Sequence, residues 1–144
     1  MSARRGERGM SVSVEMAILV PALVLIIALV TGGGRLALAR INVQQWADSA
    51  ARSATLARAG HEARERAATV VASDAAASDT RCSGPPDVSA DVSAFAHPVG
   101  VAGSVVVTVR CHVPLADLLL PGVPGTVTVE RDATSPLDRY RGRR

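Results

Sequence analysis

The stretch MAILVPALVLIIALVTGGG (Met16–Gly34) decides the fold, because it carries no charged side chain from end to end. At ~1.5 Å of rise per residue such a run makes a helix about 28 Å long. That length is close to the ~30 Å hydrocarbon thickness of a bilayer. Pro21 does not oppose the assignment, since proline is tolerated in membrane helices. We therefore predict a transmembrane helix over about 16–34, softened at its far end by Gly32–Gly34.

The charges in front of this run predict its orientation. Arg4, Arg5 and Arg8 outnumber Glu7, and the positive-inside rule keeps such an end in the cytoplasm. Arg35 and the later Arg40 lie just beyond the span and reduce the asymmetry. We expect a single-pass protein of the cell membrane with its N-terminus in the cytoplasm and its C-terminal head outside.

Two kinds of export signal are alternatives to a membrane anchor. A basic start and an apolar run followed by Ala37-Leu38-Ala39 could form a cleavable secretory signal. Against this, Arg35 stands between the apolar run and the cut. Arg4-Arg5 could instead belong to a twin-arginine signal, but the residues that follow, GERG, lack an apolar residue. Neither alternative explains the acidic residue just ahead of the span.

Glu15 is that residue, a carboxylate at the threshold of the apolar run. A charged group inside lipid is disfavoured by a few kcal/mol, about 3 on insertion scales. Glu15 could lie at the cytoplasmic headgroup level, where it costs little. It could instead meet a positive group inside an assembly, such as the free α-amino group of a neighbouring subunit whose leader is cut near Gly9.

The first 58 residues resemble the N-terminal region of TadE-like pseudopilins of tight-adherence (Flp-type) pilus systems. In that family a basic leader ends in glycine, a glutamate heads an apolar helix with a proline, and a Gly-Arg step leads into a polar, Ala-rich helix. The order and spacing carry the resemblance more than any single motif. The matching features here are Arg4-Arg5, Gly9, Glu15, Pro21, Gly34-Arg35, and Val43-Gln44-Gln45 through Ala51-Arg52.

The resemblance implies a role in pilus assembly and a set of partners. These are the lipid bilayer, other pilin or pseudopilin subunits, a prepilin peptidase that cuts between Gly9 and Met10, and the platform proteins of the pilus. One departure stands out: counted from Met10, Glu15 is the sixth residue, where the fifth is usual. The alternative is a membrane-anchored or secreted binding module unrelated to pili.

Arg35 to Asp79 contains no proline and is rich in alanine, so we expect it to be helical. Gly60 is the expected kink or break, and Trp46 is expected to pack on the head or on a partner. A stripe of mostly small residues suits close packing. Its members are Leu36, Val43, Ala47, Ala50, Ala54 and Ala57.

Three segments of the C-terminal half alternate apolar and polar residues with period two, as half-buried strands do. They are 87–95, 104–113 and 126–130, with turn residues HPVGVAG between the first two. The segment that precedes the third strand carries Leu118-Leu119-Leu120, either a buried loop or an exposed contact patch. We predict a three-stranded antiparallel sheet that covers the apolar face of the helix.

A hairpin between the first two strands that turns near Val99 pairs position 111 with a residue near 87. Cys82 lies just upstream, so it can reach Cys111. We predict a disulfide between them, because an exported head lies in an oxidising compartment. Two free buried thiols, or a zinc site with His97 and His112, are the alternatives, although the spacing has no paired-ligand motif.

The fold class is therefore α+β: a long N-terminal helix packed by a small sheet head. We divide the chain into a basic leader (1–9), a long helix (10–80), a β-sheet head (81–134) and a basic tail (135–144). The net charge is +3, but aromatic residues make up only 2%, so no nucleic-acid platform is expected. No catalytic or nucleotide-binding motif occurs. We expect neither an enzyme nor a cofactor.

Overall fold

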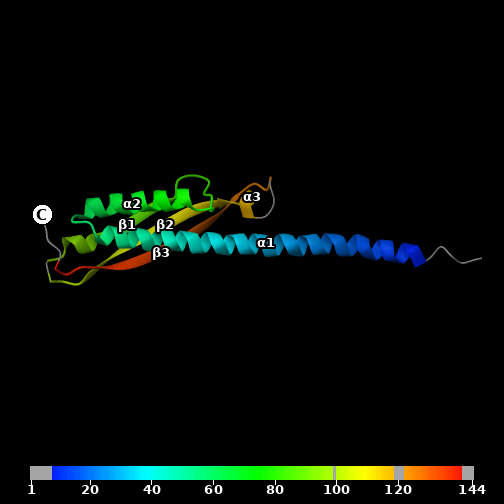
Figure 1. The fold of residues 1–144 in the computed structure, drawn as a ribbon, viewed down its shortest axis with the longest axis horizontal. Helices are drawn as coiled ribbons and strands as arrows, with labels where there is room; N and C mark the ends of the chain where they lie inside the picture. The colour runs from blue at the N-terminus through cyan, green and yellow to red at the C-terminus, as the bar shows by residue number, and fades with distance from the viewer. Residues whose placement is uncertain (1–7, 99, 119–121, 141–144) are drawn as a thin grey trace, which may run out of the picture.

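The structure is a computed structural model that describes residues 8–98, 100–118 and 122–140, with side chains from Glu15 onward. A long helix runs through the molecule, and the rest of the chain is gathered along its C-terminal half (Figure 1). Most of the predicted leader, the last four residues of the predicted tail, and Leu119 and Leu120 lie outside the described residues.

Two helices occupy the range 10–80, where we expected one long helix. α1 (Arg8–Thr55) contains Pro21 and continues without interruption through Gly32–Gly34. Its last turn tightens, with Leu56 N–H donating to the Ser53 carbonyl at 3.2 Å. α2 (Gly60–Ala77) then folds back along α1 (Figure 1). The predicted break at Gly60 is confirmed, and it makes the second helix a partner of the first.

The predicted three-stranded antiparallel sheet is confirmed, in the order β1-β2-β3. β1 (Asp87–Asp91) pairs with β2 (Gly103–Pro114), and β2 pairs with β3 (Thr126–Leu137). Two short helical segments follow β1 and β2: η1 (Ser93–Ala96) and α3 (Leu115–Leu118). The first strand is shorter than predicted and the third is longer.

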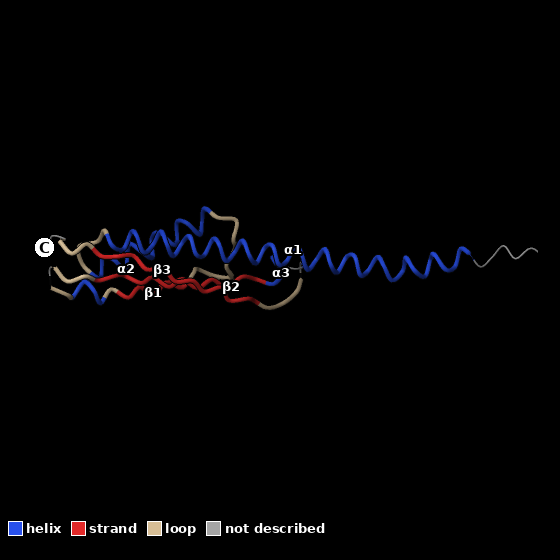
Figure 2. Tube along the Cα trace, turned by 90° about the horizontal axis from the view of Figure 1, so that it is seen from below, coloured by secondary structure: helices blue, strands red, loops and turns tan. Residues whose placement is uncertain are grey.

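Both helices cover one face of the sheet (Figure 2). α1 packs on β2 and β3, and α2 packs on α1 and β1. The period-two pattern explains why one face suffices: Val105, Val107, Val109, Cys111 and Val113 of β2 are all buried beneath the helices. The opposite face of the sheet is polar and open.

The core between helices and sheet is made of small side chains. The predicted stripe is confirmed, since all of its members are buried except Leu36, which is partly buried. Small residues let the helices approach the sheet and one another closely. Gly103 has the same effect at the start of β2, where η1 packs on the strand. A Cβ at Gly103 would lie 2.6 Å from the Cβ of Ala94, which no real contact allows. The fully buried alanines of α1 and α2 are Ala47, Ala50, Ala54, Ala63 and Ala67.

The predicted disulfide between Cys82 and Cys111 is confirmed, with the two Cα atoms 5.4 Å apart. The predicted hairpin register is right to within one residue, because Asp87 pairs with Arg110. Ser83 N–H also donates to the His112 carbonyl at 2.7 Å. The bridge closes a loop of 29 residues, which is worth about 3–4 kcal/mol in the chain-entropy account. It fastens the segment after α2 to the middle strand.

Candidate membrane and assembly surface

The N-terminal half of α1 extends beyond the head (Figure 1), and its large apolar side chains are exposed. Exposed fractions run from 54% to 69% for its large apolar residues, which are Met16, Ile18, Leu19, Val20, Leu23, Val24, Leu25, Ile26, Ile27, Leu29 and Val30. A helix that is apolar all round must be buried in something. Among the described residues, α1 is the helix long and apolar enough to cross a membrane.

Glu15 is exposed at the start of this surface. Its carboxylate has no hydrogen bond or ion pair with any described residue of its own chain. The backbone is already helical at Gly9 and Met10, and the side chain of Met10 lies outside the described part of the structure. The predicted cut between these two residues therefore stays a prediction.

Pro21 lies inside α1, six residues beyond Glu15, without ending the helix. Because proline has no N–H, the carbonyl of Ala17 loses the hydrogen bond that an ordinary residue at position 21 would donate. Such a freed carbonyl is tolerated inside a membrane helix only where neighbouring groups satisfy it. Pro21 and Glu15 thus mark two sites, less than two turns apart, at which a polar group has no hydrogen-bonding partner within the described chain.

Arg35 marks the point at which α1 enters the head. Its Nη1 donates to the backbone carbonyl of Asp117 at 2.7 Å, and Leu36 is the first residue of α1 to pack against the core. Asn42, two turns on, donates to the hydroxyl of Thr80 at 2.7 Å. The sequence singled out Arg35 only as a charge after the span, and nothing in the sequence indicated its partner 82 positions away.

On the flank of β3, Gln44 donates to the backbone carbonyl of Asp132 at 3.1 Å, and the side chain of Arg131 donates to the carbonyl of Glu130 at 2.7 Å. Pro136, near the end of the same strand, has no N–H to offer. Polar side chains and proline are the usual means of protecting an edge strand from pairing with another chain. β3 therefore does not present a clean edge for addition of a further strand.

The open face of the sheet carries the best-formed ion pair of the head. Arg110 and Glu130 face each other at 2.8 Å across β2 and β3. The hydrogen bond from Arg110 lowers the pKa of Glu130, and the same bond raises the pKa of Arg110. His112 Nδ1 lies 2.9 Å from the hydroxyl of Thr128. These groups are exposed, so the pair contributes little to stability.

On α2, Glu62 and Arg66 form an ion pair at 2.8 Å. The backbone N–H of Arg58 donates to Glu62 as well, at 3.0 Å. These two bonds, the backbone one first, lower the pKa of the Glu62 carboxyl. These bonds hold the start of α2 in place, and the side chains of Glu62 and Arg66 are otherwise open to water.

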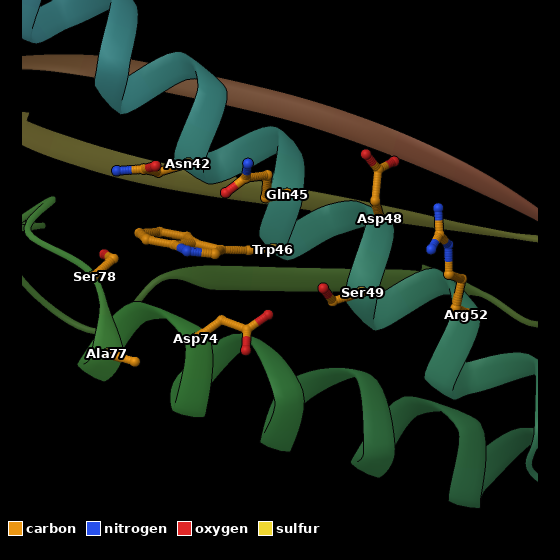
Figure 3. Close-up of a pocket in the computed structure, with 9 residues that line it drawn as sticks. All are labelled: Asn42, Gln45, Trp46, Asp48, Ser49, Arg52, Asp74, Ala77 and Ser78. Carbon is orange, nitrogen blue, oxygen red and sulfur yellow. The ribbon is translucent and has the colours of Figure 1, made fainter.

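A polar groove of about 510 Å³ lies between α1 and α2 (Figure 3). Trp46 forms its floor and is 3% exposed, so the expectation that it packs on the head is confirmed. Asp48 and Arg52 project from α1, and Asp74 projects from α2 (Figure 3). None of the side chains that line the groove is a nucleophile hydrogen-bonded to a base, so we infer no catalytic role for it.

The zinc alternative finds no support in the described residues. No group of three or more His, Cys, Asp or Glu side chains there could hold a metal ion. Both cysteines are in the disulfide. The expectations of no active site and no cofactor stay predictions.

Residues 10–52 match the family described as TadE-like protein. Neither the curated proteins nor the solved structures include a match to this chain. The matched segment contains Glu15, Pro21 and Arg35, and it covers most of both halves of α1. The resemblance predicted from the sequence is therefore confirmed: residues 10–52 of this chain are a TadE-like segment.

Proposed function

We propose that this chain is a minor pilin or pseudopilin that acts in the assembly of a tight-adherence (Flp-type) pilus. It crosses the membrane once through the first half of α1 and carries its head outside the cell. The TadE-like match over residues 10–52 supports a role related to such a pilus, and the shape of the molecule supports an assembly subunit.

The main support for the proposal is that one unbroken helix, α1, is exposed along its first half and buried in the head along its second half. From Met16 to Val30 the large apolar side chains of α1 are more than half exposed, whereas Val43, Ala47, Ala50 and Ala54 are fully buried. A subunit built this way holds its head rigidly on its membrane helix. Movement of the helix in or out of the bilayer then moves the head with it, as assembly of a filament from the membrane requires.

The disulfide supports the proposed orientation. Bonds such as Cys82–Cys111 persist in oxidising compartments and are rare in the cytosol. A head outside the membrane, with Arg4, Arg5 and Arg8 inside, agrees with both the disulfide and the positive-inside rule.

The buried position of Ala39 supports a helix that is not cut at Ala37-Leu38-Ala39. Ala39 is 3% exposed and lies in the middle of α1, whereas proteases favour exposed, poorly ordered segments. Loss of everything before Arg40 would also remove Arg35 and its bond to the Asp117 carbonyl.

In this proposal Glu15 is an assembly residue. A prepilin peptidase cuts between Gly9 and Met10, and the new α-amino group of one subunit pairs with Glu15 of its neighbour. The pairing is favourable because two opposite charges near lipid attract far more strongly than in water. Pro21 presents the unpaired Ala17 carbonyl on the same stretch of helix. The platform proteins of the pilus are the further partners.

Substitution of Glu15 tests the role. We expect Glu15→Ala to insert into the membrane at the normal level but to lower incorporation into pili at least tenfold. Glu15→Asp should restore part of the loss, and Glu65→Ala, an exposed glutamate of α2, is the control. Immunoblotting of membrane and sheared-pilus fractions measures both steps. Pili that contain Glu15→Ala at the normal level would contradict the role of Glu15.

N-terminal sequencing of the membrane-bound protein tests the processing step. A mature start at Met10 is expected. A start at Arg40 points instead to a secreted module, and an intact Met1 or Ser2 points to a subunit that is not processed.

A further inference from the structure

A second cavity, of about 500 Å³, lies at the end of the head that faces the apolar half of α1. α3 lies beside α1 there, where the helix leaves the head (Figure 1). The wall of the cavity is part charged and part apolar. Two arginines, Arg35 and Arg81, and two aspartates, Asp79 and Asp117, line it together with Leu38 and Leu118.

The four charged side chains share the cavity without pairing with one another. The described chain has ion pairs elsewhere, but none of them joins Arg35 or Arg81 to Asp79 or Asp117. Among these four residues the described chain has one hydrogen bond, from Arg35 to the backbone carbonyl of Asp117. Two cations and two anions therefore keep unused hydrogen-bonding capacity around one small space, and their formal charges sum to zero.

The position of the cavity fixes what surrounds it. The uncharged run ends at Gly34, so Arg35 lies about 28 Å from the start of the span. The cavity reaches from Arg35 to Asn42 along α1, which is up to about 10 Å farther. The headgroup layer is about 5–8 Å thick on each side of the ~30 Å hydrocarbon core. The cavity thus opens at the level of the outer headgroups.

The apolar part of the wall continues toward the lipid. Leu38 is 60% exposed beside the cavity, whereas Leu118 is 4% exposed and closes its inner side. A Cβ added at Gly33 or Gly34 would meet nothing within 4 Å, so α1 is thin just below the cavity. A molecule with a charged end in the cavity has room for an apolar chain alongside the helix.

We propose that this cavity binds the headgroup of one outer-leaflet phospholipid that carries both a phosphate and a primary ammonium group. The arginines donate to the phosphate, and the aspartates accept from the ammonium. Leu38 contacts the first part of an acyl chain. An anionic headgroup without an amine leaves both aspartates unpaired, and a trimethylated amine cannot donate a hydrogen bond to them.

The binding would set how deeply the helix sits in the bilayer and how the head is oriented above it. It rests on the proposed function only in requiring that α1 spans a membrane with its head outside. It does not depend on cleavage at Gly9 or on any role of Glu15.

Native mass spectrometry of the full-length protein released from nanodiscs tests the proposal. The nanodiscs contain equal amounts of phosphatidylethanolamine, phosphatidylglycerol and phosphatidylcholine. We expect one retained phosphatidylethanolamine per chain, in about tenfold excess over each of the other two, as the loss of one charge-assisted hydrogen bond implies. Equal retention of the three lipids, or preference for phosphatidylglycerol, overturns the proposal.

Paired variants assign the site. Asp79→Asn with Arg81→Gln should reduce the retained lipid about tenfold, because it removes one charge of each sign from the cavity. Asp138→Asn with Arg64→Gln makes the same chemical changes at exposed positions outside the cavity and should change nothing. Equal retention by both double variants overturns the site. Protein that fails to enter nanodiscs at all overturns the membrane assignment as well.

Discussion

The two halves of α1 are built from different apolar residues and have opposite surroundings. In the first half the side chains are large, mainly Leu, Ile and Val, and they are exposed in all directions. In the second half the buried side chains are mostly alanines, and polar residues such as Gln45 and Arg52 occupy exposed positions. Large side chains suit lipid, which fits around any shape, whereas alanines suit close contact with a helix and a sheet.

The comparison also separates what each half can tolerate. A charge is costly anywhere in the first half and only at inward positions in the second. A larger apolar residue is costly at inward positions in the second half and harmless in the first. The first two changes below test these two contrasts, and the third tests whether the two halves respond independently to acid.

The largest effect is expected from a charge in the first half. Leu25→Arg replaces a residue favourable in lipid with an unfavourable one, a difference of about 3–4 kcal/mol near the centre of a membrane helix. We expect a large loss of the alkali-resistant membrane fraction. Gln45→Arg, an exposed position of the same helix, is the matched control and should remain in the membrane. If Leu25→Arg is retained as well as the parent chain, the first half does not cross the bilayer.

The contrast between the halves was visible in the sequence because each half has its own pattern. An uncharged run predicted the span, and small residues at three- and four-residue steps predicted the buried stripe. Period-two alternation predicted the sheet, and the hairpin register that followed from it brought Cys82 to Cys111. These features depend on neighbours in sequence, so the sequence reports them directly.

The strand ends depend on tertiary contacts and were predicted less well. The alternation predicts that the first strand continues to Phe95, but β1 ends at Asp91, and Val92 and Ala94 are buried through the turn of η1. The alternation also predicts a third strand that ends at Glu130, whereas Arg131 is partly buried within β3. The side chain of Arg131 donates to the Glu130 carbonyl, and the strand continues to Leu137.

The membrane-proximal cavity could not be predicted at all. Arg35, Arg81 and Asp117 come from three parts of the chain and meet only because α2 folds back and the disulfide holds the segment after it against β2. Each residue alone reads as an ordinary surface charge. Their juxtaposition is a property of the fold.

A smaller effect is expected from added bulk in the second half. Ala54→Leu adds three carbon atoms at a position with 0% exposure between helix and sheet. Overpacking of this kind costs about 1–3 kcal/mol, so the head should unfold at lower denaturant. Ala22→Leu makes the same change at an exposed position of the first half and should leave head unfolding unchanged. Denaturant titration in detergent, followed by Trp46 fluorescence, measures both. Equal stability of the two variants would mean that the head does not pack on α1.

The smallest effect is expected from acid, and it should be confined to the head. Arg110 holds the pKa of Glu130 below its ordinary value of 4.5. Because the folded state binds this proton less readily than the unfolded state, the pair stabilises the head above that value. The contribution is lost as the pH falls through the lowered pKa. Glu130→Gln should therefore be slightly less stable than the parent chain at pH 7 and equal to it near pH 2. Glu65→Gln removes a carboxylate that makes no ion pair in the described chain, so its difference from the parent should be smaller at pH 7.

Membrane attachment should not follow the same pH dependence, since Met16–Gly34 contains no group that titrates. An attachment that weakened together with head stability in acid would show that the two halves of α1 are not independent.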